Sequence, residues 1–157
     1  MSAPAARDNA PDNARYKRPE SVLVVVYTRG VQVLLLRRKH PDNLWQSVTG
    51  ALDWGEKPRA AAVRELREET GLPADGLVDC KTSHPFVIYP IWRHRYPPGV
   101  VENVEHVFRM EVAAPCDIAL DEAEHGEYGW FDYDEALARI SSHTNVAAVE
   151  RWVPQGG

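Results

Sequence analysis

Three glutamates near the end of one predicted helix have the types and spacing of a metal site. Glu65, Glu68 and Glu69 stand at i, i+3 and i+4, so their side chains share one helix face. Like charges at this spacing cost about 0.2–0.5 kcal/mol per pair, and acids at a helix C-terminus oppose its dipole by about 0.3–1 kcal/mol. A divalent cation bound by the three carboxylates would turn this net repulsion into a net attraction. Converging carboxylates without His or Cys favour Mg²⁺ or Mn²⁺ over zinc.

Two other interpretations compete with a metal site. Arg64 and Arg67 on the same helix could screen a charged face that is merely solvated. Two glycines in the preceding loop have the spacing of a phosphate-binding P-loop, but Glu56 and Lys57 occupy the positions where that motif requires Lys and then Ser or Thr. The P-loop interpretation is therefore disfavoured.

A longer pattern contains the glutamates. Residues 50–72 read GALDWGEKPRAAAVRELREETGL, which matches Gly-x5-Glu-x7-Arg-Glu-U-x-Glu-Glu-x-Gly-U, with U apolar, at every position. The sequence resembles the Nudix hydrolases. This resemblance implies an α/β fold, an α/β/α sandwich with a mixed β-sheet and a loop-helix-loop catalytic element. It also implies hydrolysis of a nucleoside diphosphate linked to another moiety.

The resemblance assigns roles within this pattern. Arg64 is expected to orient a glutamate, Glu56 to balance that arginine, and Gly50 to allow a close backbone approach. The expected metal ligands, for Mg²⁺ or alternatively Mn²⁺, are Gly50, Glu65, Glu68 and Glu69. The expected catalytic residues are Arg64, Glu65, Glu68 and Glu105.

Glu105 lies outside the pattern, at the start of a predicted strand. A water nucleophile needs a proton acceptor within hydrogen-bond reach, and Glu105 is a candidate. The alternative is an ordinary surface strand residue, since Glu102 is an equally acidic neighbour.

Three further stretches resemble one subgroup of the family, the bacterial dihydroneopterin triphosphate pyrophosphatases. They are YKRPESVLVVVY (16–27), LWQSVTG (44–50) and HRYPPGVVENVEHVF (94–108), with VDCKT (78–82) as a weaker fourth. The subgroup implies Mg²⁺-dependent release of pyrophosphate from dihydroneopterin triphosphate in folate biosynthesis, which leaves the monophosphate. A broad house-cleaning hydrolase of nucleoside triphosphates or dinucleoside polyphosphates is one alternative. A non-catalytic binding module is another, which the complete set of glutamates disfavours.

Cationic and aromatic residues in these stretches could bind such a substrate. Guanidinium and ammonium groups at strand ends could clamp a triphosphate, and aromatic rings could stack on a flat heterocycle. The predicted substrate-binding residues are Lys17, Arg18, Arg38, Trp45, Arg95 and Tyr96. Trp92 could also stack, although core packing is the commoner role for a tryptophan there.

Composition limits the other possibilities. The chain has 157 residues, 44% hydrophobic and 26% charged, which favours one globular domain. A net charge of −5 argues against nucleic-acid polymers and membranes as partners, and two cysteines are too few for a disulfide framework. We expect a cytoplasmic protein, a monomer or homodimer, that acts on a small-molecule triphosphate. Residues 1–15 are expected to form a disordered tail before a Nudix hydrolase domain over 16–153.

Apolar periodicity predicts the elements that must position these groups. Strands are expected at 21–28 and 31–38 as a hairpin, then at 45–49, 76–82, 86–92, 105–112 and 127–131. Helices are expected over 58–70, ended by Gly71, over 134–140, and after Thr144 as an N-cap. Strands interleaved with helices predict a layered α/β domain.

Overall fold

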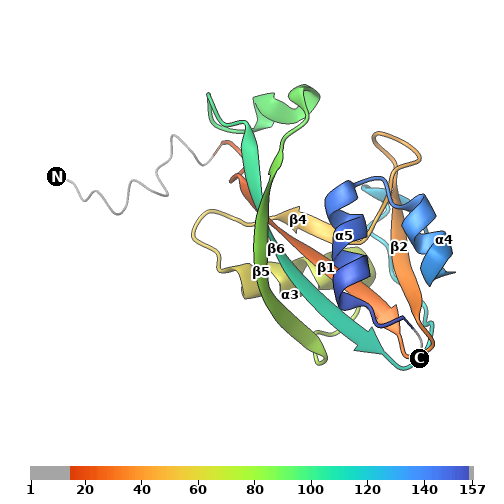
Figure 1. The fold of residues 1–157 in the computed structure, drawn as a ribbon. Coiled ribbons are helices and arrows are strands. Elements are labelled where there is room, and N and C mark those ends of the chain that lie inside the picture. The colour runs from red at the N-terminus through yellow and green to blue at the C-terminus, as the bar shows by residue number, and fades with distance from the viewer. Residues whose placement is uncertain (1–14, 156–157) are drawn as a thin grey trace.

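A seven-stranded mixed sheet forms the centre of the molecule in the computed structural model, which describes residues 15–155. The predicted tail therefore lies, apart from Arg15, outside the described residues. Helices cover both faces of the sheet (Figure 1), so the predicted α/β/α sandwich is confirmed. The strands are β1 Glu20–Thr28, β2 Gln32–Arg38, β3 Trp45–Gln46, β4 Val48–Ala51, β5 Leu77–Val87, β6 Glu102–Val112 and β7 His125–Asp132. The helices are α3 Pro58–Thr70, α4 Tyr133–Arg139, α5 His143–Trp152 and the 3₁₀ helix η1 Pro90–Arg95.

The sheet has the order β3-β2-β1-β6-β5, with β4 also paired to β1 and β7 to β2. The β1–β6 pair is parallel and every other pair is antiparallel. Strand β1 is buried along nearly its whole length because it has neighbours on each edge and helices over each face. Its continuous VLVVV run is typical of a strand that is buried on both sides.

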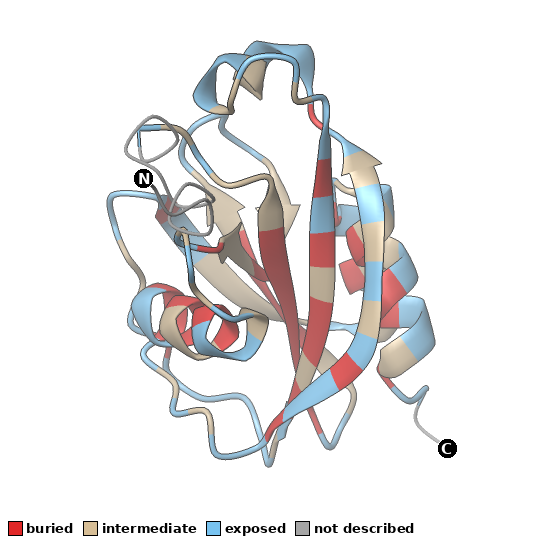
Figure 2. Cartoon of the chain, turned by 90° about the vertical axis from the view of Figure 1, so that its left-hand side faces the viewer, coloured by how far each residue is buried: buried red, intermediate tan, exposed pale blue. Residues whose placement is uncertain are grey.

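Successive residues of β1 enter two different hydrophobic cores. Val22 and Val24 pack with Leu66 of α3, whereas Leu23 and Val25 pack with residues of α4 and α5. This alternation follows from the two-residue period of a strand. Figure 2 shows the buried positions concentrated where the central strands meet the inner sides of the helices.

Helix α3 matches its predicted bounds. Pro58 occupies the first turn, where a missing N–H costs no hydrogen bond, and Leu66 is fully buried against the sheet. Gly71 ends the helix in a left-handed conformation with φ 76°, and its N–H donates to the carbonyl of Arg67. The helix that carries the three glutamates is thus fixed at both ends.

Several expected element bounds were wrong. The strands expected over 76–82 and 86–92 form one strand, β5, which ends at Val87, because Pro90 cannot donate to a ladder and the chain turns into η1. The strand expected over 45–49 is divided into β3 and β4, which pair with β2 and β1 respectively. The N-cap of the last helix is Ser142 rather than Thr144, since the Ser142 side chain accepts a hydrogen bond from the Asn145 N–H. Within residues 15–155, no helix is long and apolar enough to cross a bilayer.

Candidate active site

The carboxylates of α3 differ strongly in exposure. Glu69 is 2% exposed and Glu65 is 9% exposed, while the Glu68 side chain is 54% exposed. Burial raises the pKa of Glu69 well above its ordinary value, and the neighbouring Glu65 and Glu124 charges add to this shift. Burial also raises the pKa of Glu65. The structure therefore holds two adjacent buried acids whose ionised forms are penalised.

Gly50 on β4 lies directly against the Glu65 carboxylate. A Cβ atom at position 50 would clash with both Glu65 carboxylate oxygens. The glycine is required here for close approach, as the sequence predicted, because any side chain would displace Glu65 from the β4 backbone.

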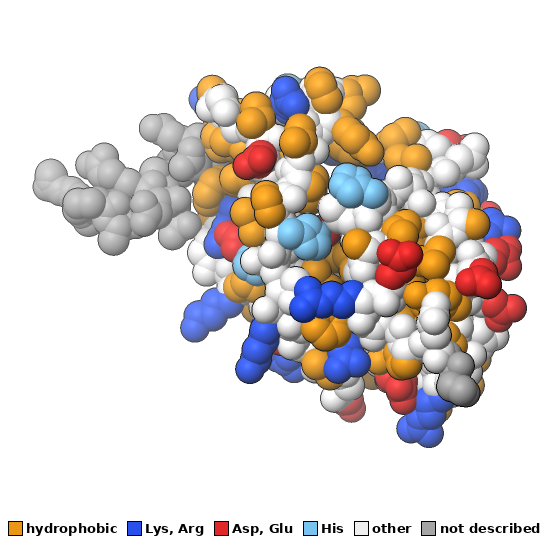
Figure 3. Space-filling model, in the orientation of Figure 1, with side chains coloured by type: hydrophobic (Ala, Val, Ile, Leu, Met, Phe, Trp, Pro, Cys, Tyr) orange, Lys and Arg blue, Asp and Glu red, His pale blue; other side chains and the backbone are white. Residues whose placement is uncertain are grey.

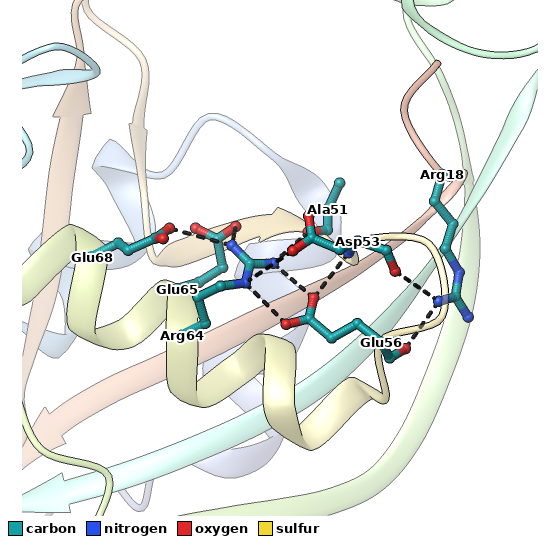
Figure 4. A network of polar contacts seen from close by, with 7 residues as sticks. All are labelled: Arg18, Ala51, Asp53, Glu56, Arg64, Glu65 and Glu68. Atoms are coloured by element: carbon teal, nitrogen blue, oxygen red, sulfur yellow. Dashed lines mark hydrogen bonds and ion pairs between the residues drawn. The ribbon is translucent and has the colours of Figure 1, made fainter. Parts of the chain in front are cut away.

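Arg64 joins the helix to the loop before it (Figure 4). Its Nε and Nη2 atoms donate to the two carboxylate oxygens of Glu56 over 2.9 and 2.8 Å, and Nη2 also donates to the Ala51 carbonyl over 3.1 Å. Its Nη1 atom donates to Glu65 over 3.0 Å and to Glu68 over 3.3 Å. The hydrogen bonds to Glu56 are the largest cause of the raised pKa of Arg64. This guanidinium therefore orients Glu65 and also engages Glu68.

Arg18 binds the loop between β4 and α3 instead of facing open solvent. Its Nη1 atom donates to the carbonyls of Asp53 and Glu56 over 3.0 and 2.9 Å (Figure 4). Its Nη2 atom pairs with Glu20 over 2.6 Å. The Asp53 N–H in turn donates to Glu56 over 2.9 Å. The predicted substrate-binding residue Arg18 thus already has protein partners, and it fixes the loop that Arg64 reaches.

Three predicted cations gather beside the carboxylates. Burial lowers the pKa of Lys17, the positive charges of Arg95 and Arg38 lower it further, and Glu124 and Glu65 oppose them. The β2–β7 register places Arg38 opposite His125, whose Nε2 atom lies 4.0 Å from Glu69 Oε1, so Arg38 adjoins the α3 carboxylates. The Lys17 backbone N–H also donates to the Arg95 carbonyl over 2.7 Å, which ties the start of β1 to η1.

Aromatic rings adjoin these cations. The Lys17 ammonium lies 5.9 Å from the centroid of the Tyr96 ring, and the Arg38 guanidinium lies 5.5 Å from that of Trp92. Both distances are within the range of cation–π contacts. Tyr96 therefore lies at the predicted site, together with Trp92.

Two site residues were missed by the sequence reasoning. Glu124 precedes β7 and its charge acts on Glu69 and Lys17. His125 begins β7 opposite Arg38, is 2% exposed, and has its Nε2 atom 4.0 Å from Glu69 Oε1. Their only sequence signal is a position just before a strand, and His125 lacks the spacing of a metal-binding histidine.

Burial keeps His125 neutral near pH 7. It lowers the pKa of His125 to about 4, and the Arg38 charge acts in the same direction. Among the described residues, neither His125 Nδ1 nor Glu69 Oε1 has a hydrogen-bond partner. Unsatisfied buried polar atoms on two neighbouring side chains are unusual, because each carries an uncompensated desolvation cost.

Trp45 does not reach this cluster. Its ring packs edge to face against Phe131, with centroids 5.2 Å apart, and the Arg139 guanidinium lies 5.4 Å from its centroid. The register places Trp45 opposite Arg37, one residue from Arg38, and the two-residue period sends the tryptophan to the α4 side of the sheet.

Glu105 is also on the other face. It lies opposite Ser21 in the β1–β6 register and points to the same side as Val107, which packs with α4 and α5. It is 6% exposed, pairs with His84 Nε2 over 3.0 Å, and burial raises its pKa. The sheet therefore separates Glu105 from the glutamates of α3.

We expect the Glu105→Gln variant to keep kcat within about threefold of the parent, because the sheet stands between position 105 and α3. Its pairing with His84 would weaken, so thermal melts should show a loss of stability, by roughly 1–3 kcal/mol for a disrupted buried hydrogen bond to a charged group. Steady-state kinetics check this, with Glu102→Gln on the same strand as the exposed control. A 100-fold loss of kcat in a folded Glu105→Gln protein would instead make this carboxylate part of the reaction.

Comparison with known proteins identifies the family. The NUDIX domain family model matches residues 17–153. The chain belongs to the Nudix family. Dihydroneopterin triphosphate diphosphatase of Escherichia coli K12 is 39% identical over 143 residues, which cover 88% of this chain and 94% of that protein. The protein of the same name from Haemophilus influenzae is 35% identical over 144 residues, 88% of this chain and 90% of that protein.

A solved structure gives the same result for the fold. The E. coli dihydroneopterin triphosphate pyrophosphohydrolase has a TM-score of 0.82 and 38% sequence identity, and the match covers 88% of this chain and 97% of that one. This Nudix protein is accordingly a hydrolase that acts on phosphoanhydride bonds. The resemblance drawn from the sequence is confirmed, and so is the enzyme class.

Nudix hydrolases generally use divalent metal ions, and the α3 region fits such an ion. Its donors are all oxygens, and Glu69 Oε1 is buried without a hydrogen bond to the described residues. A cation would compensate the charge that burial disfavours on Glu65 and Glu69. Within residues 15–155, no three His, Cys, Asp or Glu side chains are already gathered around one point. In this Nudix structure Glu68 is paired with Arg64 instead.

Proposed function

We propose that this enzyme hydrolyses dihydroneopterin triphosphate to dihydroneopterin monophosphate and pyrophosphate, with Mg²⁺ as the preferred ion. The observation that carries the proposal is the position of cations beside the buried α3 carboxylates: Arg38 lies opposite His125, whose Nε2 atom is 4.0 Å from Glu69 Oε1. The Lys17 N–H donates to the Arg95 carbonyl over 2.7 Å, and the charges of Arg95, Arg38 and Glu65 all act on the Lys17 ammonium. The names of relatives 35–39% identical over most of the chain support the pterin substrate.

The acidic residues would hold the metal ion and the cationic residues would bind the triphosphate. Glu65, Glu68, Glu69 and the Gly50 carbonyl would hold the ion, which when bound neutralises phosphate oxygens and lowers the pKa of the attacking water. Lys17, Arg38 and Arg95 would bind the triphosphate oxygens, and the planar guanidinium groups suit two-pronged contacts.

Arg64 would keep Glu65 in place by the contact seen over 3.0 Å. Glu124, which directly precedes His125 and whose charge acts on Glu69 and Lys17, replaces Glu105 as the candidate to accept a proton from water. The reaction consumes one water and breaks one phosphoanhydride bond, so pyrophosphate leaves in a single step.

We place the enzyme in the cytoplasm, because its substrate would be a small molecule and its composition is acidic. We expect a monomer or homodimer. The second candidate, a broad hydrolase of nucleoside triphosphates, draws support from the aromatic rings beside the cations, because stacking alone accepts any flat ring.

A competition assay tests the substrate. We expect a higher kcat/KM for dihydroneopterin triphosphate than for dATP, GTP or diadenosine tetraphosphate, with pyrophosphate as the first product. A site that hydrogen-bonds a pterin edge rejects a purine because the buried polar groups would be left unpaired. The assay uses purified protein with Mg²⁺ and resolves the products by chromatography. An equal or higher kcat/KM for dATP, or orthophosphate as the first product, would move the enzyme into the broad class.

A further inference from the structure

The connection between β5 and β6 presents an exposed apolar tip. Its exposed side chains include Tyr89 at 57% and Ile91 at 73%, with Val87 and Val101 beside them. Figure 3 shows hydrophobic side chains gathered at the top of the molecule, above the η1 segment of Figure 1, with cationic groups among them. Contiguous apolar patches that are rimmed by polar or charged residues mark binding sites, whereas apolar side chains exposed singly are normal on protein surfaces.

This tip is held in a defined conformation. The Ile88 N–H donates to the Val101 carbonyl over 2.9 Å, and Arg93 Nε donates to the Ile88 carbonyl over 2.9 Å. The Trp92 N–H donates to the Tyr89 carbonyl over 2.9 Å. Ile88 itself is buried at 2% and anchors the turn. The exposed rings are therefore presented by a fixed backbone.

Two aromatic rings meet at this turn. The Tyr89 and Trp92 ring centroids are 5.4 Å apart with an angle of 39° between the planes. Trp92 is half-buried and lies next to the Arg38 guanidinium, so it supports the more exposed Tyr89 ring. Trp92 thus links Tyr89 to Arg38, and Arg38 lies opposite His125, whose Nε2 atom is 4.0 Å from Glu69 Oε1 of α3.

We propose that Tyr89 is the stacking surface for the heterocyclic ring of the substrate, with Trp92 as the residue that positions it. A ligand with a flat ring at one end and a triphosphate at the other matches the order of aromatic, cationic and carboxylate groups along this surface. The proposal rests on the proposed function, which places the triphosphate at the cations, and it sets the direction in which the substrate lies. The sequence reasoning named neither Tyr89 nor this orientation.

The surrounding charge favours this occupant over a second copy of the chain. A symmetric dimer contact through the tip would bring like patches together, so the cationic last turn of η1, with Arg93 and Arg95, would approach the cationic patch of the other copy. Such like-charge contacts oppose association. An anionic ligand instead gains from the same cations.

Steady-state kinetics on the full chain test the proposal. Tyr89→Ala is expected to raise KM at least about tenfold, the scale of a lost stacking contact, with kcat within about threefold. Tyr89→Phe, which keeps the ring, and Ile91→Ala, which changes a still more exposed side chain of the same turn, are expected to stay near the parent. Trp92→Ala should also raise KM, and Trp92→Phe should rescue it. Circular dichroism melts establish that each variant is folded.

A ring-free probe separates stacking from phosphate binding. The inhibition constant of inorganic tripolyphosphate should not change in Tyr89→Ala, because this ligand has no ring. Unchanged KM values, or equal weakening of tripolyphosphate, would overturn the proposal. So would a dimer in sedimentation that Tyr89→Ala dissociates without a change in KM, since the tip would then bind a second copy.

Measuring dihydroneopterin triphosphate and dATP in parallel keeps this proposal apart from the proposed function. If dATP is the better substrate, the pterin assignment fails, yet Tyr89→Ala should still raise the KM of dATP. If the pterin is preferred and Tyr89→Ala has no effect on either KM, the stacking proposal alone fails.

Discussion

The Glu69→Gln variant is expected to lose about 100-fold or more of kcat while its apo form becomes more stable. Glu69 is 2% exposed beside Glu65, and burial raises its pKa well above the ordinary range. The amide keeps the shape but removes the charge that would bind the ion, and that ion's charge stabilisation amounts to several kcal/mol. The measurements are kcat over a Mg²⁺ titration and thermal melts in EDTA, with the exposed Glu150→Gln as control.

The pH dependence of the melts gives this result a definite sign. Between pH 4.5 and the raised folded pKa, the folded protein keeps a proton on Glu69 that the unfolded chain has released. The contribution of Glu69 to the free energy of unfolding is therefore fully present below pH 4.5, and it is lost as pH rises through the folded pKa. The advantage of Glu69→Gln should therefore grow with rising pH above 4.5. His125 acts in the opposite direction: its pKa of about 4 makes the protein lose stability as pH falls from 6.5 to 4. Turnover near the parent value at low Mg²⁺ would remove Glu69 from the ion site.

The Arg64→Lys variant should lose both stability and activity. The guanidinium makes two hydrogen bonds to Glu56, one to Glu65 and one to the Ala51 carbonyl, and an ammonium group cannot reproduce this fork. We expect a loss of about 1–3 kcal/mol in the free energy of unfolding. Because Glu65 would no longer be held, the Mg²⁺ concentration at half-maximal activity should rise about 10–100-fold, as is usual when a residue that orients a metal ligand is changed.

Arg67→Lys is the matched control, because Arg67 is exposed three residues further along the same helix. It should leave both quantities nearly unchanged. Urea unfolding and Mg²⁺ titrations compare the two variants. If both behave alike, the role assigned to Arg64 belongs to the helix in general and the interpretation of Figure 4 would be abandoned.

The sequence predicted the local parts of the site well. Residues 50–72 predict the helix from local signals alone. A proline starts the helix, a glycine ends it, and 3.6 residues per turn put the three glutamates on one face. Lys17, Arg38 and Arg95 were predicted together with Arg18 as substrate-binding cations, and the structure gives Arg18 protein partners instead. Local pattern and short-range geometry were sufficient for the helix and its glutamates.

The errors came from long-range register. Whether Glu105 or Trp45 faces α3 depends on strand pairing, and a shift of one residue reverses the face. A strand that is apolar on both sides, such as β1, gives no sign in its sequence of which side will carry the site. His125 and Glu124 were missed for the same reason, since their place beside Glu69 depends on the pairing of β7 with β2, far away in the chain.

The parallel pairing of β1 with β6 also has a kinetic consequence. It joins strands from opposite halves of the chain, and closing such a long loop must precede any gain from the contacts that it brings. Helix α3 and its capping turns can form early from neighbouring residues. The β5–η1–β6 hairpin is local too, but its cations can approach the carboxylates of α3 only after β6 has paired with β1. We therefore expect ligand-binding competence to arise in the last, rate-limiting phase of folding, after most helical signal has already developed.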